Sequence, residues 1–261
     1  MYIFQHRGLF QPLSLAMMFG CASFIAGCAG DTETKAKPAV VIEEPPKAVE
    51  KLPKPVPAGA PAFWQDVPDL RDYHQYENGL RWRLGPSGIQ LESTVIEGNK
   101  VDRQIIQQVW DDYGDTMEQW STHYGVPIEI VMTTVCVESK GNARATNAKN
   151  FGLMQILVPT ARNALNDQSI TEDSLYDPEI AIKAGTAYIA LQANQTKYDP
   201  PKVAAAYNAG SLRSADNPWG MKQYGPHLDK TVMWFNEVLA FVAIKNEVPP
   251  VSFADYFRKH P

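Results

Sequence analysis

The feature that most restricts the fold of this chain is a long run of apolar residues spaced three or four apart. Between Asp102 and Gly125 they recur at Ile105, Ile106, Val109, Trp110, Tyr113, Met117, Trp120 and Tyr124. This spacing puts them on one face of an α-helix, and glycine commonly ends a helix. The sequence therefore predicts a long amphipathic helix that must pack its apolar face inside a mainly α-helical globule.

The segment that follows Gly125 carries two conflicting signals. Pro127 suits the first turn of a helix, and apolar residues continue at helical spacing at Ile128, Val131, Met132 and Val135. Many side chains in this segment are β-branched, however, which favours a strand. We give more weight to the spacing and to the proline, and predict a helix over residues 128–140, closed by Gly141.

Four more helices are predicted further along the chain, at residues 160–165, 178–195, 202–207 and 227–245. Residues 80–93 instead alternate apolar and polar side chains around a Gly-Pro-Ser-Gly turn, which is typical of a β-hairpin. Trp82 in this hairpin could brace the fold or line a groove, and we favour bracing. The predicted fold class is mainly α, one helical globule with a small N-terminal β-hairpin.

Residues 1–28 have the pattern of an export signal. His6 and Arg7 precede an apolar centre, and small residues lead to a cysteine. Gln11, Pro12 and Ser14 interrupt the apolar run, so a permanent membrane-spanning helix is the weaker alternative. We therefore expect this segment to be removed from the mature protein.

The end of this signal, Ile25 to Cys28, resembles the lipobox of bacterial lipoproteins. The resemblance implies that Cys28 becomes the lipidated first residue of the mature chain, and several acyl chains would hold the protein at a membrane durably. In that family an Asp after the cysteine favours the inner membrane, whereas here Ala29 follows. We expect a lipid anchor at the periplasmic face of the bacterial outer membrane.

Residues 29–62 are typical of a tether rather than a domain. They contain seven prolines, five lysines and five acidic residues, with few large apolar groups. Residues 63–261 then keep 18 basic and 24 acidic residues, a net charge near −6. This charge is a poor match to nucleic acid, so no nucleic-acid partner is expected.

The cysteines and histidines indicate neither a disulfide nor a metal site. Cys21 leaves with the signal and Cys28 carries lipid, so Cys136 remains alone and is expected in the core. The histidines of residues 63–261 are isolated in sequence, and no spacing typical of metal ligands occurs. We expect no cofactor.

One acidic residue, Glu138, follows an apolar run, and the next Asp or Glu is Asp167. On the predicted helix it shares the stripe of Val131 and Val135 and lies in the last turn. Burial and the negative end of the helix dipole both disfavour its anion, although Lys140 and the nearby Arg144 would oppose them if they pointed inward. We expect a protonated Glu138 that can donate a proton. The alternative, a Glu138 that faces water, stays open on the local sequence.

Several motifs place the chain near a known family. They are Glu138-Ser139, "GLMQI" at 152–156 with "PTA" at 159–161, "LYDPE" at 175–179, and "AAYNAG" at 205–210. In this order they look like the catalytic domain of the soluble lytic transglycosylases, which is related to goose-type lysozyme. The resemblance implies a catalytic domain, which we place over 101–245. Residues 63–100 lie outside the resemblance and are expected as an accessory segment, and residues 246–261 as a tail.

The resemblance also implies a reaction. The family cleaves the β-1,4 bond between N-acetylmuramic acid and N-acetylglucosamine in peptidoglycan glycan strands, and forms a 1,6-anhydro product with one glutamate as acid and base. Glu138 matches that glutamate, and Ser139 would help orient the sugar. Met154 and Gln155 would line the cleft, and Tyr207 and Asn208 would contact the N-acetyl group or Glu138.

Two other functions compete with this one. A lysozyme-like muramidase would use water in place of the sugar's own hydroxyl group, and an inactive lipoprotein would bind the cell wall without cleaving it. The expected partners are glycan strands and, through the lipid anchor, a membrane; the sequence indicates no particular protein partner.

Overall fold

The structure, a computed structural model, describes residues 68–74, 81–92, 101–214, 219–222 and 225–261. All of these lie in one compact unit, Val49–Pro261. The export signal, the lipobox cysteine Cys28 and the tether over 29–62 lie outside the described residues. None of the helices in the described part of the chain is long and apolar enough to cross a bilayer.

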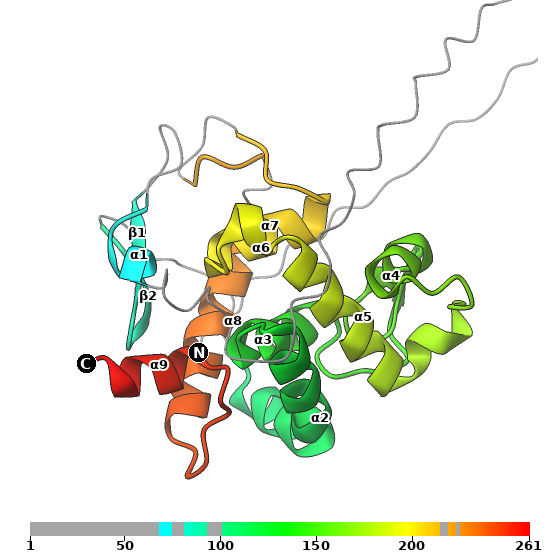
Figure 1. The fold of residues 1–261 in the computed structure, drawn as a ribbon, viewed down its shortest axis with the longest axis horizontal. Helices are drawn as coiled ribbons and strands as arrows, with labels where there is room; N and C mark the ends of the chain where they lie inside the picture. The colour runs from blue at the N-terminus through cyan, green and yellow to red at the C-terminus, as the bar shows by residue number, and fades with distance from the viewer. Residues whose placement is uncertain (1–67, 75–80, 93–100, 215–218, 223–224) are drawn as a thin grey trace, which may run out of the picture. The chain divides into compact units, whose positions relative to one another are not determined.

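The centre of the unit is α3, Ile128–Glu138, which packs against α2, Arg103–Tyr124, and α8, Pro226–Ala243 (Figure 1). The predicted helix over 103–124 is confirmed, with the Asp102 side chain accepting a hydrogen bond from the Gln104 N–H at its start. At its end, Gly125 adopts a left-handed φ of 67°. These end signals are local, which explains why the sequence predicted this helix closely.

The β-branched segment is α3, as predicted, although it ends sooner than expected. Nine of its eleven residues are buried, and this enclosure by neighbouring helices outweighs the strand propensity of Val and Ile. The helix ends at Glu138, with Ser139 rather than Gly141 as its cap. Cys136 is fully buried, as expected, and burial raises the pKa of its thiol to about 12.

The remaining predicted helices are also present. They are α4 (Val158–Leu165), α5 (Pro178–Leu191), α6 (Ala193–Thr196) and α7 (Pro200–Ala209). The helix predicted over 178–195 is divided into α5 and α6 at Gln192. The helix predicted at 227–245 is α8, and α4 packs along α5. A mainly α-helical fold is thus confirmed.

A small antiparallel sheet beside α4 was not predicted. Its strands are β3 (Thr146–Asn147), β4 (Asn150–Phe151) and β5 (Ile156–Leu157), in that order. Gly152 follows β4 with a φ of +73°, and a Cβ atom there would lie 1.8 Å from the Leu175 carbonyl oxygen. The "GLMQI" segment can therefore pass this close to the short helix η2 (Asp173–Tyr176) because it begins with glycine.

The predicted hairpin is confirmed as β1 (Trp82–Gly85) and β2 (Gly88–Leu91), which follow the short helix α1 (Pro68–Arg71). The Trp82 side chain is buried, and its indole N–H lies 2.9 and 3.0 Å from the two carboxylate oxygens of Asp199, at the start of α7. The Ile89 N–H donates to Asn236 Oδ1 on α8 at 2.7 Å. Trp82 thus braces the fold, as favoured from the sequence.

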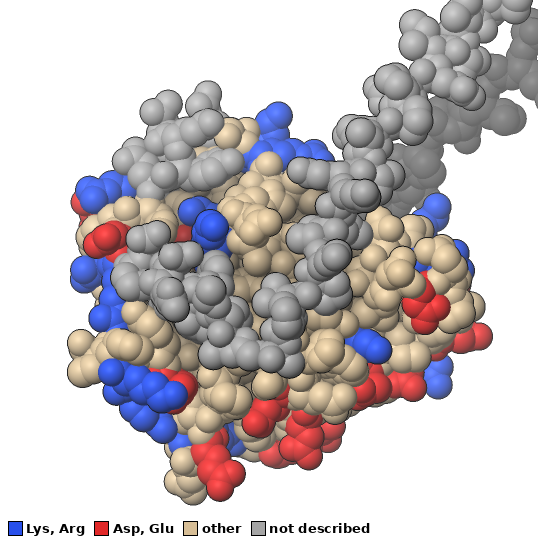
Figure 2. All heavy atoms as spheres, viewed as in Figure 1, with Lys and Arg blue, Asp and Glu red and all other residues tan. Residues whose placement is uncertain are grey.

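The segment expected as a tail contains α9, Phe253–Lys259, with Phe253 and Phe257 buried in the core. On the face in Figure 2, acidic side chains gather over α2 and basic ones over the hairpin and α9. Several of the basic groups are paired, because Arg81 contacts Glu92 at 2.8 Å and Lys259 contacts Asp255 at 2.6 Å. The basic side is therefore partly neutralised.

Candidate active site

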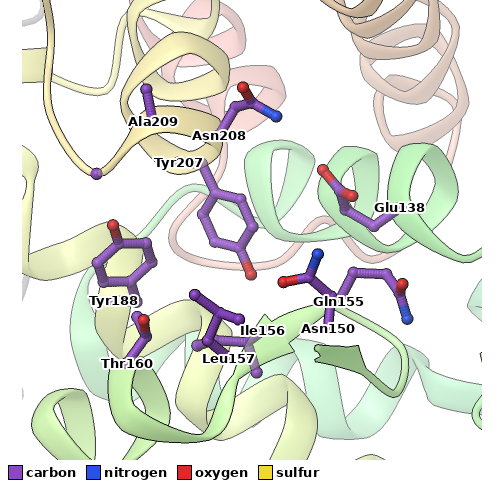
Figure 3. Close-up of a pocket in the computed structure, with 11 residues that line it drawn as sticks. Glu138, Asn150, Gln155, Ile156, Leu157, Thr160, Tyr188, Tyr207, Asn208 and Ala209 are labelled. Atoms are coloured by element: carbon purple, nitrogen blue, oxygen red, sulfur yellow. The ribbon is translucent and has the colours of Figure 1, made fainter. Parts of the chain in front are cut away.

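A pocket of about 340 Å³ opens where α3, the small sheet, α4, α5 and α7 meet (Figure 3). Its lining combines one carboxyl group with amide, hydroxyl and apolar side chains. The lining residues are Glu138, Asn150, Gln155, Ile156, Leu157, Thr160, Tyr188, Tyr207, Asn208, Ala209 and Gly210. Segments up to 72 positions apart in the chain therefore contribute to one site, with Glu138 at one end of that interval and Gly210 at the other.

Glu138 is the last residue of α3, and its side chain points into the pocket. The side chain is 21 % exposed. Burial raises the pKa of the carboxyl group from 4.5 to about 7, and the positive charge of Lys230 opposes this rise. Near neutral pH the group is thus present in both forms, which suits a residue that donates a proton and then takes one.

This pKa has a consequence for stability. Between pH 4.5 and about 7 the folded chain binds more protons at Glu138 than the unfolded chain does, so this group lowers the free energy of unfolding as pH rises through that window. We expect Glu138→Gln to raise the free energy of unfolding relative to the unmodified chain, and this gain should be larger at pH 8 than at pH 4.5 by up to about 3 kcal/mol. Urea unfolding of both proteins at the two pH values measures this difference. An equal effect at both would contradict the raised pKa.

Two basic residues near the start of α8 lie beside Glu138. His227 Nε2 is 3.9 Å from Glu138 Oε1, and Lys230 Nζ donates to the Val137 carbonyl oxygen at 2.7 Å. The sequence had suggested Lys140 and Arg144 as the opposing cations, but Lys230 has that effect. Because α8 begins almost ninety positions after Glu138, no local pattern could have indicated either residue.

Tyr207 projects from α7 into the middle of the pocket (Figure 3). Its hydroxyl group donates to the Met154 carbonyl oxygen at 2.8 Å, and its ring centre lies 5.4 Å from that of Tyr188. Burial, together with the charges of Glu138 and Tyr188, raises the pKa of Tyr207 well above its ordinary value. The phenol therefore remains protonated and available as a donor. Asn208, the next residue, lines the pocket beside it.

Of the predicted site residues, Glu138, Gln155, Tyr207 and Asn208 are brought together in the lining. The amide nitrogen of Gln155 is committed to its own loop, because it donates to the carbonyl oxygens of Ala145 at 2.9 Å and Gly152 at 3.0 Å. Gln155 thus stabilises the turn between β4 and β5.

Two predicted residues lie beside the pocket and not in its lining. The Ser139 hydroxyl group donates to the Val135 carbonyl oxygen at 3.1 Å, so it completes the end of α3. The Met154 side chain is fully buried and packs over Gly185, where a Cβ atom would lie 2.3 Å from the Met154 sulfur. Sugar contacts by these two side chains remain predictions.

The pocket also contains residues to which the sequence assigned no role. Asn150 on β4 and Thr160 on α4 place polar groups at the rim, and Tyr188 on α5 adds an aromatic ring. Thr160 belongs to the "PTA" motif at 159–161, so the motif was the available signal for it. Asn150 lies next to Glu138 in space only because β4 folds back on β5.

A second depression, of about 880 Å³, lies over the start of α2 and the adjoining face of α8. Its charged residues are Asp102, Arg103 and Glu237, of which Arg103 and Glu237 pair with each other at 2.7 Å. Across the described ranges no group of three or more His, Cys, Asp or Glu could hold a metal ion. Glu138 and its pocket therefore form the best candidate for chemistry.

Comparisons with known proteins agree with the motifs. Residues 115–225 match the family of the transglycosylase SLT domain. A curated relative, membrane-bound lytic murein transglycosylase E of Buchnera aphidicola subsp. Baizongia pistaciae, is 38% identical over 84 residues, which cover 29% of this chain and 39% of that protein. This chain therefore spans about two fifths of that relative's length.

A solved structure, an inactive mutant of the lytic transglycosylase Slt from Pseudomonas aeruginosa, has a TM-score of 0.45 and 20% sequence identity. The match covers 57% of this chain and 28% of that chain.

Proposed function

We propose that this chain, whose residues 115–225 match the transglycosylase SLT domain, is a peptidoglycan lytic transglycosylase that cleaves the β-1,4 bond between N-acetylmuramic acid and N-acetylglucosamine. One observation carries the proposal. Among the described residues that line the pocket, Glu138 has the one carboxyl group, and its pKa is raised to about 7. Most glycosidases need two carboxyl groups, whereas a lytic transglycosylase needs one.

The reaction proceeds in two proton transfers. Protonated Glu138 donates its proton to the oxygen of the glycosidic bond, and the bond between that oxygen and C1 breaks. The carboxylate then takes the proton from the C6 hydroxyl group of the same sugar, whose oxygen bonds to C1 and closes the 1,6-anhydro ring. The second transfer restores protonated Glu138. An attacking group within the same molecule has an effective concentration of about 10⁵ to 10⁸ M, so no bound water is required.

The other lining residues suit a sugar substrate. Ile156, Leu157 and Tyr188 offer apolar surface to the faces of the rings, and Asn150 and Asn208 offer amide groups to hydroxyl and N-acetyl groups. Tyr207, which stays protonated, and Asn208 both line the pocket and would hold the N-acetyl group beside C1. Positive charge develops at C1 during cleavage, and the acetyl oxygen would stabilise it.

The products test this proposal directly. We expect purified protein to release muropeptides with 1,6-anhydro ends from peptidoglycan, each lighter by one water than the hydrolysed form in mass spectrometry. The closed ring forms because the C6 hydroxyl group attacks C1 instead of water. Reducing ends in place of anhydro ends would show a muramidase, and binding without any release would show an inactive cell-wall protein.

We also propose that the mature chain is a lipoprotein of the outer membrane, with Cys28 lipidated, residues 29–62 as tether and the globular part in the periplasm. The lipobox pattern supports this, and so does the membrane-bound relative. At about 3.1 Å per residue, a stretched tether reaches roughly 100 Å. We expect Cys28→Ala to move the protein from the membrane fraction to the soluble fraction; an unchanged membrane fraction would contradict the anchor.

A further inference from the structure

We propose that His227 is a positioning residue for Glu138: its imidazole holds Glu138 Oε1 in place, so that Oε2 carries the proton in both transfers. This inference rests on the proposed function and deepens it. The family motifs quoted above contain no histidine, so the role comes from the geometry of this chain.

The contact joins two helices that pack closely against each other. His227 Nε2, near the start of α8, lies 3.9 Å from Glu138 Oε1 at the end of α3. His227 is not among the residues that line the pocket, so it reaches Glu138 from outside the sugar site. A distance of 3.9 Å is longer than a hydrogen bond, but catalytic hydrogen bonds are often long in the absence of substrate and shorten in its complex.

The main chain of His227 is held in place within its own helix. Its carbonyl oxygen accepts a hydrogen bond from the Thr231 hydroxyl group at 2.8 Å. Lys230, on the same helix, donates to the Val137 carbonyl oxygen at the end of α3. The end of α3 is thus joined to the start of α8 at two points, one of which is the carboxyl group of Glu138 itself.

Burial, together with one nearby positive charge, favours the neutral form of the imidazole. Lys230 on α8 acts electrostatically on both groups of this contact, Lys140 after α3 acts on Lys230, and Glu138 acts on Tyr207 of α7. Burial and the charge of Lys230 lower the pKa of His227 below its ordinary value. A neutral imidazole donates one N–H, and we assign that hydrogen to Nε2 because this nitrogen faces the carboxyl group.

A neutral hydrogen-bond donor such as His227 suits a partner like Glu138, which must lose and regain a proton. The Nε2–H group stabilises the carboxylate after the first transfer, yet it keeps its own hydrogen throughout. A charged partner at this position would hold Glu138 in the ionised form and prevent the first transfer. Lys230 already supplies the positive charge that limits the rise of the pKa of Glu138.

Two variants of the full chain separate this role from simple packing. His227→Gln places an amide N–H near the position of Nε2, whereas His227→Met has similar length and no donor. We expect His227→Met to lower kcat by roughly 10- to 100-fold, the value of one hydrogen bond to a charged group, with little change in KM. His227→Gln should recover most of the activity. His123→Met, an exposed position on α2, serves as the control and should leave activity unchanged.

A second readout does not depend on the reaction. In a carbon-13 NMR titration of the folded proteins, the pKa of Glu138 should be higher in His227→Met than in the unmodified chain, because the Glu138 anion loses a hydrogen-bond donor. The alkaline limb of the pH–rate profile should shift to higher pH by the same amount. Equal losses in the Gln and Met variants, or an unchanged pKa of Glu138 in the Met variant, would overturn the proposal. If the pKa moves as expected but no anhydro products form, the contact stands and the proposed function fails.

Discussion

Replacing Glu138 by Gln will lower the rate of release of anhydro muropeptides by about 10²- to 10⁴-fold, the usual contribution of a general acid and base. The amide has nearly the same size and keeps the polar character of the side chain, but it can neither donate a proton to the leaving oxygen nor take one from the C6 hydroxyl group. The rate is measured on purified peptidoglycan by mass spectrometry of the products.

Binding provides the contrast that makes this result specific. Because the pocket walls remain, Glu138→Gln should still sediment with insoluble peptidoglycan almost as well as the unmodified chain. Glu172→Gln makes the same chemical change at an exposed position outside the pocket and should keep full activity. Undiminished activity in the Glu138 variant would remove this residue from the mechanism, and so would an equal loss in both variants.

The second large effect concerns folding. Glu129, at the start of α3, is completely buried, and its carboxyl oxygens accept hydrogen bonds from the Ser252 hydroxyl group at 2.6 Å and from the N–H groups of Phe253 and Ala254, both at 3.0 Å. It thereby satisfies the first turn of α9 and joins the C-terminal segment to the core helix. Burial raises the pKa of this carboxyl group, and the three hydrogen bonds oppose that rise.

We expect Glu129→Ala to lower the free energy of unfolding by about 3 to 5 kcal/mol, because it leaves three buried donors without an acceptor and opens a cavity. Urea unfolding measures this loss. Glu129→Gln keeps the volume and one acceptor oxygen and should cost less. Lys259→Ala, which removes an exposed ion pair on α9, should cost less than about 1 kcal/mol. A loss of that small size in Glu129→Ala would show that α9 is held by its apolar contacts instead.

These two glutamates also show where sequence reasoning succeeded and where it stopped. Glu138 was singled out because it stands beside an apolar run and far from the next acidic residue. Glu129 drew no comment, since nothing near it in the chain reveals that α9 returns to its carboxyl group. The tail expected after residue 245 was accordingly described too simply.

The small sheet was missed for a related reason. Its strands are two residues long, which is too short for any alternation of side chains to be visible. Their position depends on the close approach of Gly152 to Leu175 and on the hydrogen bonds that Gln155 makes to its own loop. Asn150 reaches the pocket through this packing, so no property of its neighbours in the chain could have placed it there.

The sequence by itself determined the helices with clear end signals and the hairpin around Gly85 and Gly88, because these depend on spacing or turn chemistry within a few residues. It also favoured a buried Cys136, and it singled out Glu138 through its place after an apolar run and through the family motifs. Only the tertiary structure decided that α3 ends at Glu138, that Met154 packs in the core instead of lining the pocket, and that His227 and Lys230 lie beside Glu138. The physical reason is the same in each case: burial and electrostatic effects depend on which distant segments are packed together, and a linear sequence does not state those distances.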